Sequence, residues 1–472
     1  MASKSIYFVS LGCPKNRVDT EVMLGLVDQA GLRITSAPDA ADVIVVNTCG
    51  FIGAAKEESI DTILEMARWK EAGRCERLVV TGCLSQRYAG DLRRELPEVD
   101  VLMGSGEVAD IVRAVRGATG DAIAAKPTYI YDHATPRLAS TARHSAYVKV
   151  AEGCDRPCGF CIIPRLRGAQ RSRTAEDIEA EVKALAASGA VEINLVAQDL
   201  TTWGNDLGDP DARLAVLVRR LGRVVDGTSA RWIRLHYAYP TATTNELLDA
   251  IAEEPRVAKY VDVPLQHIDD GVLKAMRRGH VGKTARALVE RVRARIPGVT
   301  LRTTLIVGHP GETEDAFASL AAFVEEAEFD RLGVFTYSKE EGTHSATLEA
   351  PETRGVPARE AERRRRELMR LQRRISKRKM KALVGRELEV LVEGRSEESE
   401  YLVEGRHAGQ APEIDGKVFL SLGEDVAAPR AGDLVRARVD SFADYDLGAT
   451  MIETIQRAPS ARGRARLPVV GG

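Results

Sequence analysis

The sequence lacks any apolar run that approaches the ~20 residues required for a membrane-spanning helix. Its first ten residues lead into a strand-like segment and contain no signal-peptide hydrophobic region. The composition, with 44% hydrophobic and 29% charged residues and a net charge of −2, is typical of a globular chain. These features predict a cytoplasmic protein with no membrane partner, long enough for about three domains.

Cysteine is also scarce, with seven residues in the whole chain. Their odd number and grouped positions argue against disulfides and predict a reducing compartment. Three of them, Cys154, Cys158 and Cys161, form a C-x3-C-x2-C run. Chance is a poor explanation for such a run, and its spacing brings three thiolates within reach of one metal centre.

This run has no fourth ligand beside it. A structural zinc site normally has a fourth Cys or His, and His144 is the one histidine within ten residues of the run. Three thiolates on a four-iron cluster leave one iron open, so we favour an iron–sulfur cluster over zinc. The spacing and its flanks resemble the radical S-adenosylmethionine (AdoMet) superfamily. That resemblance implies that the open iron binds AdoMet and that the reduced cluster cleaves it to a deoxyadenosyl radical.

Residues 1–118 alternate short apolar runs with amphipathic stretches, which predicts an α/β domain with a parallel sheet. A cysteine follows each of three expected strands: Cys13 after Ile6–Leu11, Cys49 after Val43–Asn47, and Cys83 after Leu78–Thr81. The carboxyl ends of parallel strands share one edge, so these cysteines should converge into a second site. The alternative is that they are small buried hydrophobic residues. Cys75 fits no ligand pattern.

Residues 119–139 are predicted to be a linker, and residues 140–357 a second α/β domain. Its six expected strands are Tyr147–Val150, Glu192–Ala197, Trp232–His236, Tyr260–Pro264, Leu301–Val307 and Gly333–Tyr337. Helical segments separate them, such as Ala175–Ala187 with Thr174 as its N-cap. This pattern predicts a partial (β/α)6 barrel with its chemistry at the carboxyl ends of the strands, where the C-x3-C-x2-C run falls.

Further residues at these strand ends are candidates for binding AdoMet or substrate. Glycine and proline after the fifth strand allow the backbone to approach a ligand closely, and the comparable superfamily segment lies along the adenine. The candidates for cofactor binding are Gly308, Pro310, Gly311, Glu312, Gln198 and Arg234. Asp199 and Gln266 lie in similar positions. The alternative for the polar members is ordinary solvation of the barrel rim.

The C-terminal third contains segments of opposite charge. Residues 358–381 carry 12 Lys or Arg and 3 Glu, a net charge of +9, with one apolar stripe. They are predicted to form a basic helix, either packed across the barrel mouth or facing ribosomal RNA or an acidic partner.

Residues 382–455 are predicted to form a small antiparallel β-barrel of the OB type. The strands expected there are Glu387–Val392, Tyr401–Glu404, Val418–Leu420 and Leu434–Val439, within a set of about five. This module has a net charge of −9 between Leu383 and Thr454, which suits a basic protein partner better than a nucleic acid. Residues 456–472 are predicted to be a disordered basic tail.

The order of these parts resembles the methylthiotransferases, which have a three-cysteine domain, a radical AdoMet barrel and a TRAM domain. Within that family the chain looks most similar to the enzymes that act on an aspartate of small-subunit ribosomal protein twelve. The segments that carry this resemblance are Ser10–Asn16, Val46–Ile52, Thr81–Leu84, His236–Pro240, Pro264–His267 and Phe335–Gly342. Two positions depart from the family pattern: Thr20 replaces the usual Ser, and His309 replaces the usual aromatic residue of the adenine pocket.

The resemblance implies two [4Fe-4S] clusters, with AdoMet as the cosubstrate. Cys154, Cys158 and Cys161 would hold the cluster that cleaves AdoMet, and Cys13, Cys49 and Cys83 an auxiliary cluster that carries sulfur. The aspartate β-carbon is an unactivated methylene, which a carbon radical can open. The expected partners are ribosomal protein twelve, either free or within the ribosomal subunit, and electron and sulfur donors, with nucleic acid secondary. The alternatives are a tRNA adenosine 2-methylthiotransferase and a non-enzymatic metal-binding module that docks on ribosomes.

Overall fold

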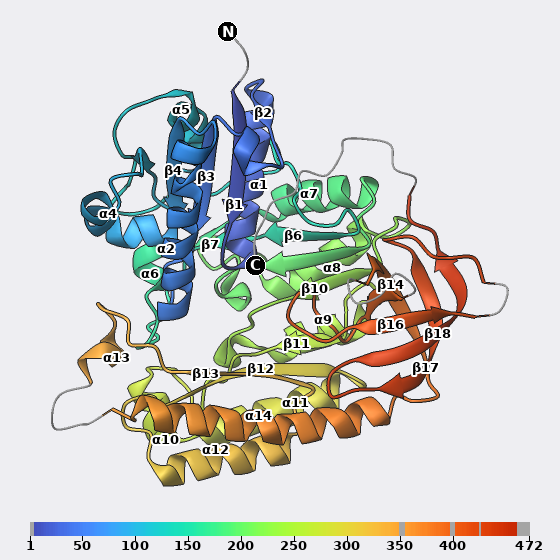
Figure 1. The fold of residues 1–472 in the computed structure, drawn as a ribbon. Helices are drawn as coiled ribbons and strands as arrows, with labels where there is room; N and C mark the ends of the chain where they lie inside the picture. Colours follow the sequence, from blue (N-terminus) through green and yellow to red (C-terminus); the bar gives the residue numbers. More distant parts are fainter. Residues whose placement is uncertain (1–3, 349–354, 397–401, 424–425, 460–472) are drawn as a thin grey trace.

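The computed structural model describes residues 4–348, 355–396, 402–423 and 426–459, which form three parts (Figure 1). The N-terminal part is a parallel sheet in the order β2-β1-β3-β4-β5. Its strands are β1 (Ser5–Ser10), β2 (Arg33–Ile34), β3 (Val43–Thr48), β4 (Arg77–Gly82) and β5 (Val101–Leu102). Its helices are α1 (Pro14–Gln29), η1 (Pro38–Ala40), α2 (Gly53–Ala67), α3 (Trp69–Ala72), α4 (Cys83–Glu95), η2 (Val108–Asp110) and α5 (Ile111–Arg116).

The central strands of this sheet are apolar on both faces because helices cover both. Alternate residues of β1, such as Ile6 and Tyr7, belong to two different apolar clusters. The first cluster includes α1 and α5, and the second includes α2 and α4. The expected parallel α/β domain is confirmed. The three strands expected from the sequence are β1, β3 and β4, and each ends within a residue or two of the expected position.

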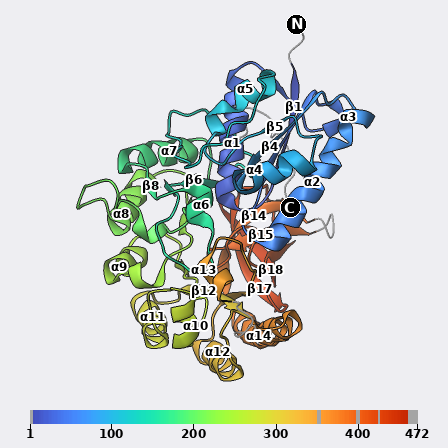
Figure 2. The same ribbon diagram turned by 90° about the vertical axis from the view of Figure 1, so that its left-hand side faces the viewer.

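The middle part contains six parallel strands whose spatial order follows the sequence. The helices between these strands follow one another in the same order, from green to yellow in Figure 2. Two hydrogen-bonded sheets, β6-β9-β10 and β11-β12-β13, meet where a single bridge joins Ile233 and Val257. The strands are β6 (Ser145–Lys149), β9 (Glu192–Val196), β10 (Trp232–Leu235), β11 (Tyr260–Asp262), β12 (Thr300–Val307) and β13 (Arg331–Thr336). The six strands of the expected partial barrel are therefore confirmed.

Short strands β7 (Ala151–Glu152) and β8 (Arg171–Ser172) pair beside this barrel. Its helices are α6 (Ile163–Arg167), α7 (Ala175–Ala187), η3 (Leu200–Thr202), α8 (Leu214–Val224), η4 (Pro240–Ala242), α9 (Asn245–Glu253), α10 (Asp270–Ala275), α11 (Gly282–Arg295), α12 (Glu314–Ala327) and α13 (His344–Thr347). Thr174 caps α7 as expected, because its side chain accepts a hydrogen bond from the Asp177 backbone N–H at 3.3 Å.

The two faces of the barrel strands differ in chemistry. One set of alternating residues, including Ile193 and Leu195, packs with the helices in a large apolar cluster. The other set is polar although equally buried, as Asn194 and Arg234 show. Since alternate side chains point to opposite faces of a strand, the helix-facing side supplies the core and the opposite side a polar interior.

The C-terminal part is a closed barrel in the order β14-β15-β16-β18-β17. Its strands are β14 (Glu387–Arg395), β15 (Val403–His407), β16 (Val418–Leu422), β17 (Leu434–Phe442) and β18 (Leu447–Gln456). The expected small barrel is confirmed. Its last strand, β18, was not one of the four strands located from the sequence, and Tyr401, the expected start of the second, lies outside the described residues. The pairing of β16 with β18 is parallel, whereas the other four are antiparallel. An odd number of strands cannot alternate in direction all the way round a closed ring.

This small barrel packs on the amino-terminal ends of the larger barrel's strands. Arg406 of β15 forms a 2.7 Å ion pair with Glu192, the first residue of β9. The hydroxyl of Tyr260, the first residue of β11, donates a 2.7 Å hydrogen bond to Asp415. In addition, Glu389 of β14 pairs with Arg231 of the larger barrel at 2.8 Å, so part of the negative charge of the small barrel is neutralised inside the molecule.

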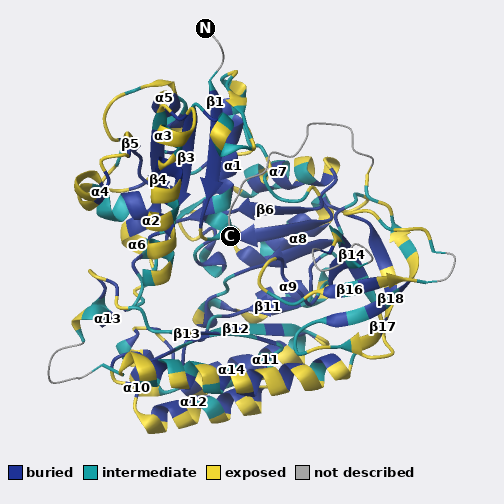
Figure 3. Ribbon diagram, viewed as in Figure 1, coloured by how far each residue is buried: buried dark blue, intermediate teal, exposed yellow. Residues whose placement is uncertain are grey.

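Helix α14 (Ala358–Lys381) joins the two barrels (Figure 1). Its apolar stripe of Leu368, Leu371 and Ile375 is buried, as expected, against the barrel core. The helix lies along β13 and α12 rather than across the barrel mouth. Its outer side is exposed (Figure 3) and carries basic residues such as Arg366 and Arg373. No helix among the described residues is long and apolar enough to cross a membrane.

The segment expected to be a linker, 119–139, contains no helix or strand and fastens two domains together. The Arg137 guanidinium binds Glu21 of α1 at 2.6 Å and Glu181 of α7 at 2.5 Å. The hydroxyl of Tyr131 donates to the same Glu181 carboxylate at 3.1 Å. These contacts fix α1 against the barrel.

Candidate functional site

Three cysteines converge at the carboxyl edge of the N-terminal sheet. Cys13 precedes α1, Cys49 follows β3 and Cys83 begins α4. Gly12 has φ +89°, and a Cβ there would lie 2.8 Å from the Cβ of Cys49, so the first two loops nearly touch. These cysteines are free thiols, and the predicted convergence is what the parallel sheet produces.

The second trio lies in one loop between β7 and α6. The N–H of Gly159 donates to the carbonyl of Met276 at 2.7 Å, and the N–H of Ser345 donates to the carbonyl of Gly159 at 2.7 Å. Gly153 has φ +79°, and a Cβ there would lie 2.1 Å from the Ala169 carbonyl oxygen. The backbone of the loop is therefore held from several sides.

The thiols of both trios are poorly hydrated. Burial raises the pKa of Cys49 to about 12 and the pKa of Cys161 to about 12, with further increases from the neighbouring cysteines. Such thiols become thiolates only when a cation or metal compensates their charge.

Each trio does have an arginine beside it. Arg167 Nε lies 3.2 Å from Cys83 Sγ, and Arg278 Nη1 lies 3.2 Å from Cys158 Sγ. Within the described part of the chain, no three His, Cys, Asp or Glu side chains are placed to hold a single metal ion. Three thiolates with arginine donors fit an iron–sulfur cluster, whose ligands bind separate irons, better than one zinc ion.

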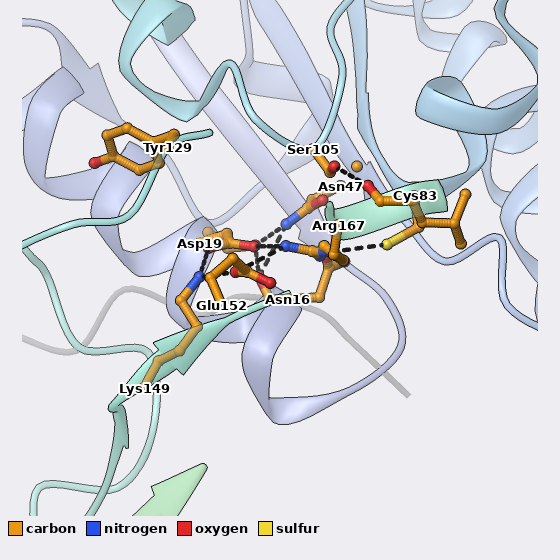
Figure 4. Close-up of polar contacts among 12 residues, drawn as sticks. Asn16, Asp19, Asn47, Cys83, Ser105, Tyr129, Lys149, Glu152 and Arg167 are labelled. Carbon is orange, nitrogen blue, oxygen red and sulfur yellow. Dashed lines mark hydrogen bonds and ion pairs between the residues drawn. The ribbon is translucent and has the colours of Figure 1, made fainter. Parts of the chain in front are cut away.

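Arg167 connects the two cysteine sites (Figure 4). Besides Cys83, its guanidinium contacts Asp19 at 2.6 Å and Asn16 at 2.9 Å, both on α1. It also lies 3.3 Å from Glu152, two residues before Cys154. One side chain from the barrel therefore touches the helix after Cys13, the thiol of Cys83 and the strand that leads to Cys154.

Lys149 completes this network from the end of β6 (Figure 4). Its ammonium is buried and pairs with Asp19 and, at 2.6 Å, with Glu152. Burial raises the pKa of Glu152, but Lys149 and Arg167 outweigh it and lower the pKa to about 2. The buried charges are thus compensated, as charges in a protein interior must be.

The six candidate AdoMet-binding residues have different surroundings. Gln198 lies beside the cysteine loop, where its Nε2 donates to Glu152 at 2.6 Å and its buried Oε1 has no partner. Such an unsatisfied acceptor fits a ligand N–H. Pro310 is buried, whereas Gly311, with φ +90°, has open space within 4 Å of the place that a Cβ would occupy.

Glu312, Gly308 and Arg234 have structural contacts that the sequence did not reveal. The Glu312 carboxylate accepts from the Gly308 N–H and pairs with Arg364 at 3.2 Å. A Cβ on Gly308 would lie 2.5 Å from the Cβ of Ala361, so this glycine is required for packing against α14. Arg234 is fully buried and pairs at 2.8 Å with Glu192, at the amino-terminal end of the barrel strands. All three residues therefore have contacts within the protein, and their contact with AdoMet stays a prediction.

Several site residues carried no local signal in the sequence. Arg167, Lys149 and Asp19 are single charged residues outside any motif, and their partners are distant in the chain. Arg278 stacks on Tyr239 at 4.3 Å from the ring centroid. For Arg167, Lys149 and Asp19, only their nearness in the sequence to Cys161, Cys154 and Cys13, respectively, could have suggested a role. Cys75 lies in the apolar core, apart from both trios.

Comparisons with known proteins agree with this arrangement. Residues 5–104 match the model of uncharacterized protein family UPF0004, residues 148–324 the radical SAM superfamily, and residues 384–452 the TRAM domain. A solved radical AdoMet methyltransferase, TsrM from Kitasatospora setae, is 16% identical with a TM-score of 0.52, covering 70% of this chain and 73% of that one. That likeness supports the fold alone.

Curated relatives are much more similar. The ribosomal protein uS12 methylthiotransferase RimO of Sorangium cellulosum is 52% identical over 96% of this chain and 92% of its own length. The protein of the same name from Anaeromyxobacter sp. (strain Fw109-5) is 51% identical over the full length of both chains.

The fold and the two three-cysteine sites define a radical AdoMet enzyme with a TRAM domain. Within that class, the chain belongs to the family of ribosomal protein uS12 methylthiotransferases named RimO.

Proposed function

We propose that this chain replaces a hydrogen on the β-carbon of an aspartate in ribosomal protein uS12 with a methylthio group. The observation that carries the proposal is the contact between the two cysteine sites through Arg167. A transfer from one site to a radical made at the other requires that they face each other. The names of relatives about 50% identical over the full chain supply the substrate.

In this proposal Cys154, Cys158 and Cys161 hold one [4Fe-4S] cluster, and Cys13, Cys49 and Cys83 hold the other. When bound, the first cluster with AdoMet supplies a carbon-centred radical, and the second supplies the sulfur. Gln198 is the candidate that offers AdoMet a free buried acceptor.

The residues around the clusters orient and protect this chemistry. Arg278 and Arg167 donate to Cys158 and Cys83 and so compensate negative charge on sulfur. Lys149 and Asp19 hold the two domains in register through buried ion pairs. Burial of the thiols keeps bulk water away from a reactive carbon radical.

The test is a reaction of the anaerobically reconstituted protein with AdoMet, a reductant and either uS12 or an unmodified tRNA. Mass spectrometry follows each substrate for the gain of one methylthio group in place of hydrogen. Modification of an aspartate in uS12 is the expected result. Modified tRNA with untouched uS12 would contradict the proposal and favour the tRNA-modifying alternative.

A further inference from the structure

Lys15, which is partly exposed, differs from the buried charges near the two cysteine sites. Lys149 and Arg167 are each matched by the carboxylates of Asp19 and Glu152. Within the described residues, no hydrogen bond or ion pair involves the Lys15 ammonium. Its recorded contact is with the ring of Tyr237, whose centroid lies 3.9 Å from Nζ. This lysine therefore retains the capacity to bind an anion.

The position of Lys15 is between the two cysteine sites. It lies two residues after Cys13, in the N-terminal part of the chain. Tyr237 belongs to the middle part and follows β10 at the carboxyl end of the barrel strands. The ammonium thus lies where the N-terminal domain meets the barrel mouth, which is where the reacting carbon must be to meet both clusters.

The surroundings of Lys15 favour an anion beside this cation. Lys15 occupies the first turn of α1, where the helix dipole favours negative charge and where no acidic residue is present. Tyr237 has φ +65°, a left-handed conformation that is uncommon for a tyrosine. A cation and a strained residue in contact at a domain junction are features that functional sites retain.

We infer that Lys15 binds the side-chain carboxylate of the target aspartate and so holds its β-carbon between the two clusters. This inference rests on the proposed function and adds the residue that selects an acidic side chain. The Tyr237 ring orients the ammonium through a cation–π contact. A nucleobase has no carboxylate to pair with this lysine, whereas an aspartate has one next to the carbon that reacts.

The experiment compares full-length reconstituted wild type with Lys15→Met, Lys15→Arg and the exposed-surface control Lys4→Met. Each is assayed on uS12 and on uS12 whose modified aspartate is replaced by asparagine, which keeps the β-methylene but loses the charge. Iron content, cluster absorbance and AdoMet affinity are measured for every variant. These readouts separate a failure to fold or to load clusters from a failure to bind the substrate.

We expect wild type and Lys4→Met to prefer aspartate over asparagine by about 10- to 100-fold in kcat/KM, the range for a hydrogen bond to a charged group. Lys15→Met should lose a similar factor on the aspartate substrate and no longer distinguish the two. Lys15→Arg should recover part of the preference, and cluster content and AdoMet affinity should not change.

Three outcomes would overturn the inference. Lys15→Met could keep wild-type kcat/KM or its preference for aspartate, which would remove the lysine from substrate binding. Its iron content or AdoMet affinity could fall instead, which would assign the cation to a cluster or to AdoMet. If wild type leaves uS12 unmodified, the proposed function fails together with this inference, whereas the first two outcomes leave that function intact.

Discussion

The barrel site draws its cysteines from one loop, whereas the N-terminal site draws them from the ends of three separate strands. The first is defined by spacing in the sequence and is held by backbone hydrogen bonds of Gly159. The second exists only when the sheet is formed, and ion pairs of Asp19 with Lys149 and Arg167 fix the helix after Cys13 against the barrel. A local motif can therefore hold its ligands with few long-range contacts, while a dispersed site depends on a network of buried charges.

The largest expected effect comes from breaking either site. Cys158→Ser and Cys49→Ser should each lower methylthio transfer by more than about a thousandfold, because a substituted ligand removes one of two essential groups. Each variant should keep about half of the wild-type iron, since the two sites load separately. Iron analysis and mass spectrometry of uS12 test this, and loss of all iron in either variant would contradict independent loading.

Loss of the arginine beside the cysteines should destabilise the protein more at the N-terminal site than at the barrel site. Arg167→Met leaves the buried carboxylates of Asp19 and Glu152 with less compensation, so we expect a loss of about 3–5 kcal/mol in the free energy of unfolding. Arg278→Met removes donors to a thiol and to the Pro264 carbonyl, with an expected loss of about 1–2 kcal/mol. Denaturant unfolding of the two variants measures the difference, and equal losses would refute the comparison.

A third region, the amino-terminal end of the barrel strands, contains the buried carboxyl of Glu192, which makes the stability depend on pH. Burial raises the pKa of Glu192, but Arg406 and Arg234 outweigh it and lower the pKa to about 2. This depressed carboxyl stabilises the folded state by about 3 kcal/mol above its unfolded pKa of about 4.3. The stabilisation is lost as the pH falls from about 4.3 toward about 2.

Glu192→Gln tests this dependence on pH. The variant should be less stable than wild type at pH 7, because two buried guanidiniums lose their charged partner. The difference should shrink as the pH falls through the same range, where wild-type Glu192 becomes protonated. Chemical denaturation at several pH values measures it, and a constant difference would show that Glu192 contributes through packing alone.

The smallest effect distinguishes two glycines of the same loop. Gly308→Ala places a methyl group against Ala361 at a positive φ and should lower the free energy of unfolding by about 2 kcal/mol. Gly311→Ala has the positive φ but open space, so a loss of about 1 kcal/mol is expected. Thermal unfolding of both variants tests whether packing on α14 is the reason for Gly308.

The sequence was sufficient for features that depend on local patterns. Strand ends followed by cysteines, the alternation of strands with helices and the apolar stripe of α14 all arise from neighbouring residues. It was insufficient where a role depends on a distant partner. Arg167 and Asp19 are 148 residues apart. Arg234 pairs with Glu192, and the Glu312 carboxylate accepts a hydrogen bond from the Gly308 N–H. No pattern in the sequence reveals these contacts.

The charge of the terminal segments shows the same limit. The net charge of −9 in the small barrel suggested a basic partner, yet Glu389 pairs with Arg231 of the larger barrel and Asp415 lies 3.9 Å from Arg302. Summed charge counts side chains that the fold has already neutralised, so it predicts a binding surface less well than the exposed charges do.

The most direct test of two cooperating sites measures deoxyadenosine and methylthiolated uS12 in the same reaction of Cys49→Ser. The account predicts that this variant still cleaves AdoMet to deoxyadenosine but transfers no methylthio group, because the barrel site is intact and the sulfur-carrying site is not. Methylthiolated uS12 from Cys49→Ser would contradict the assignment of separate roles to the two cysteine sites.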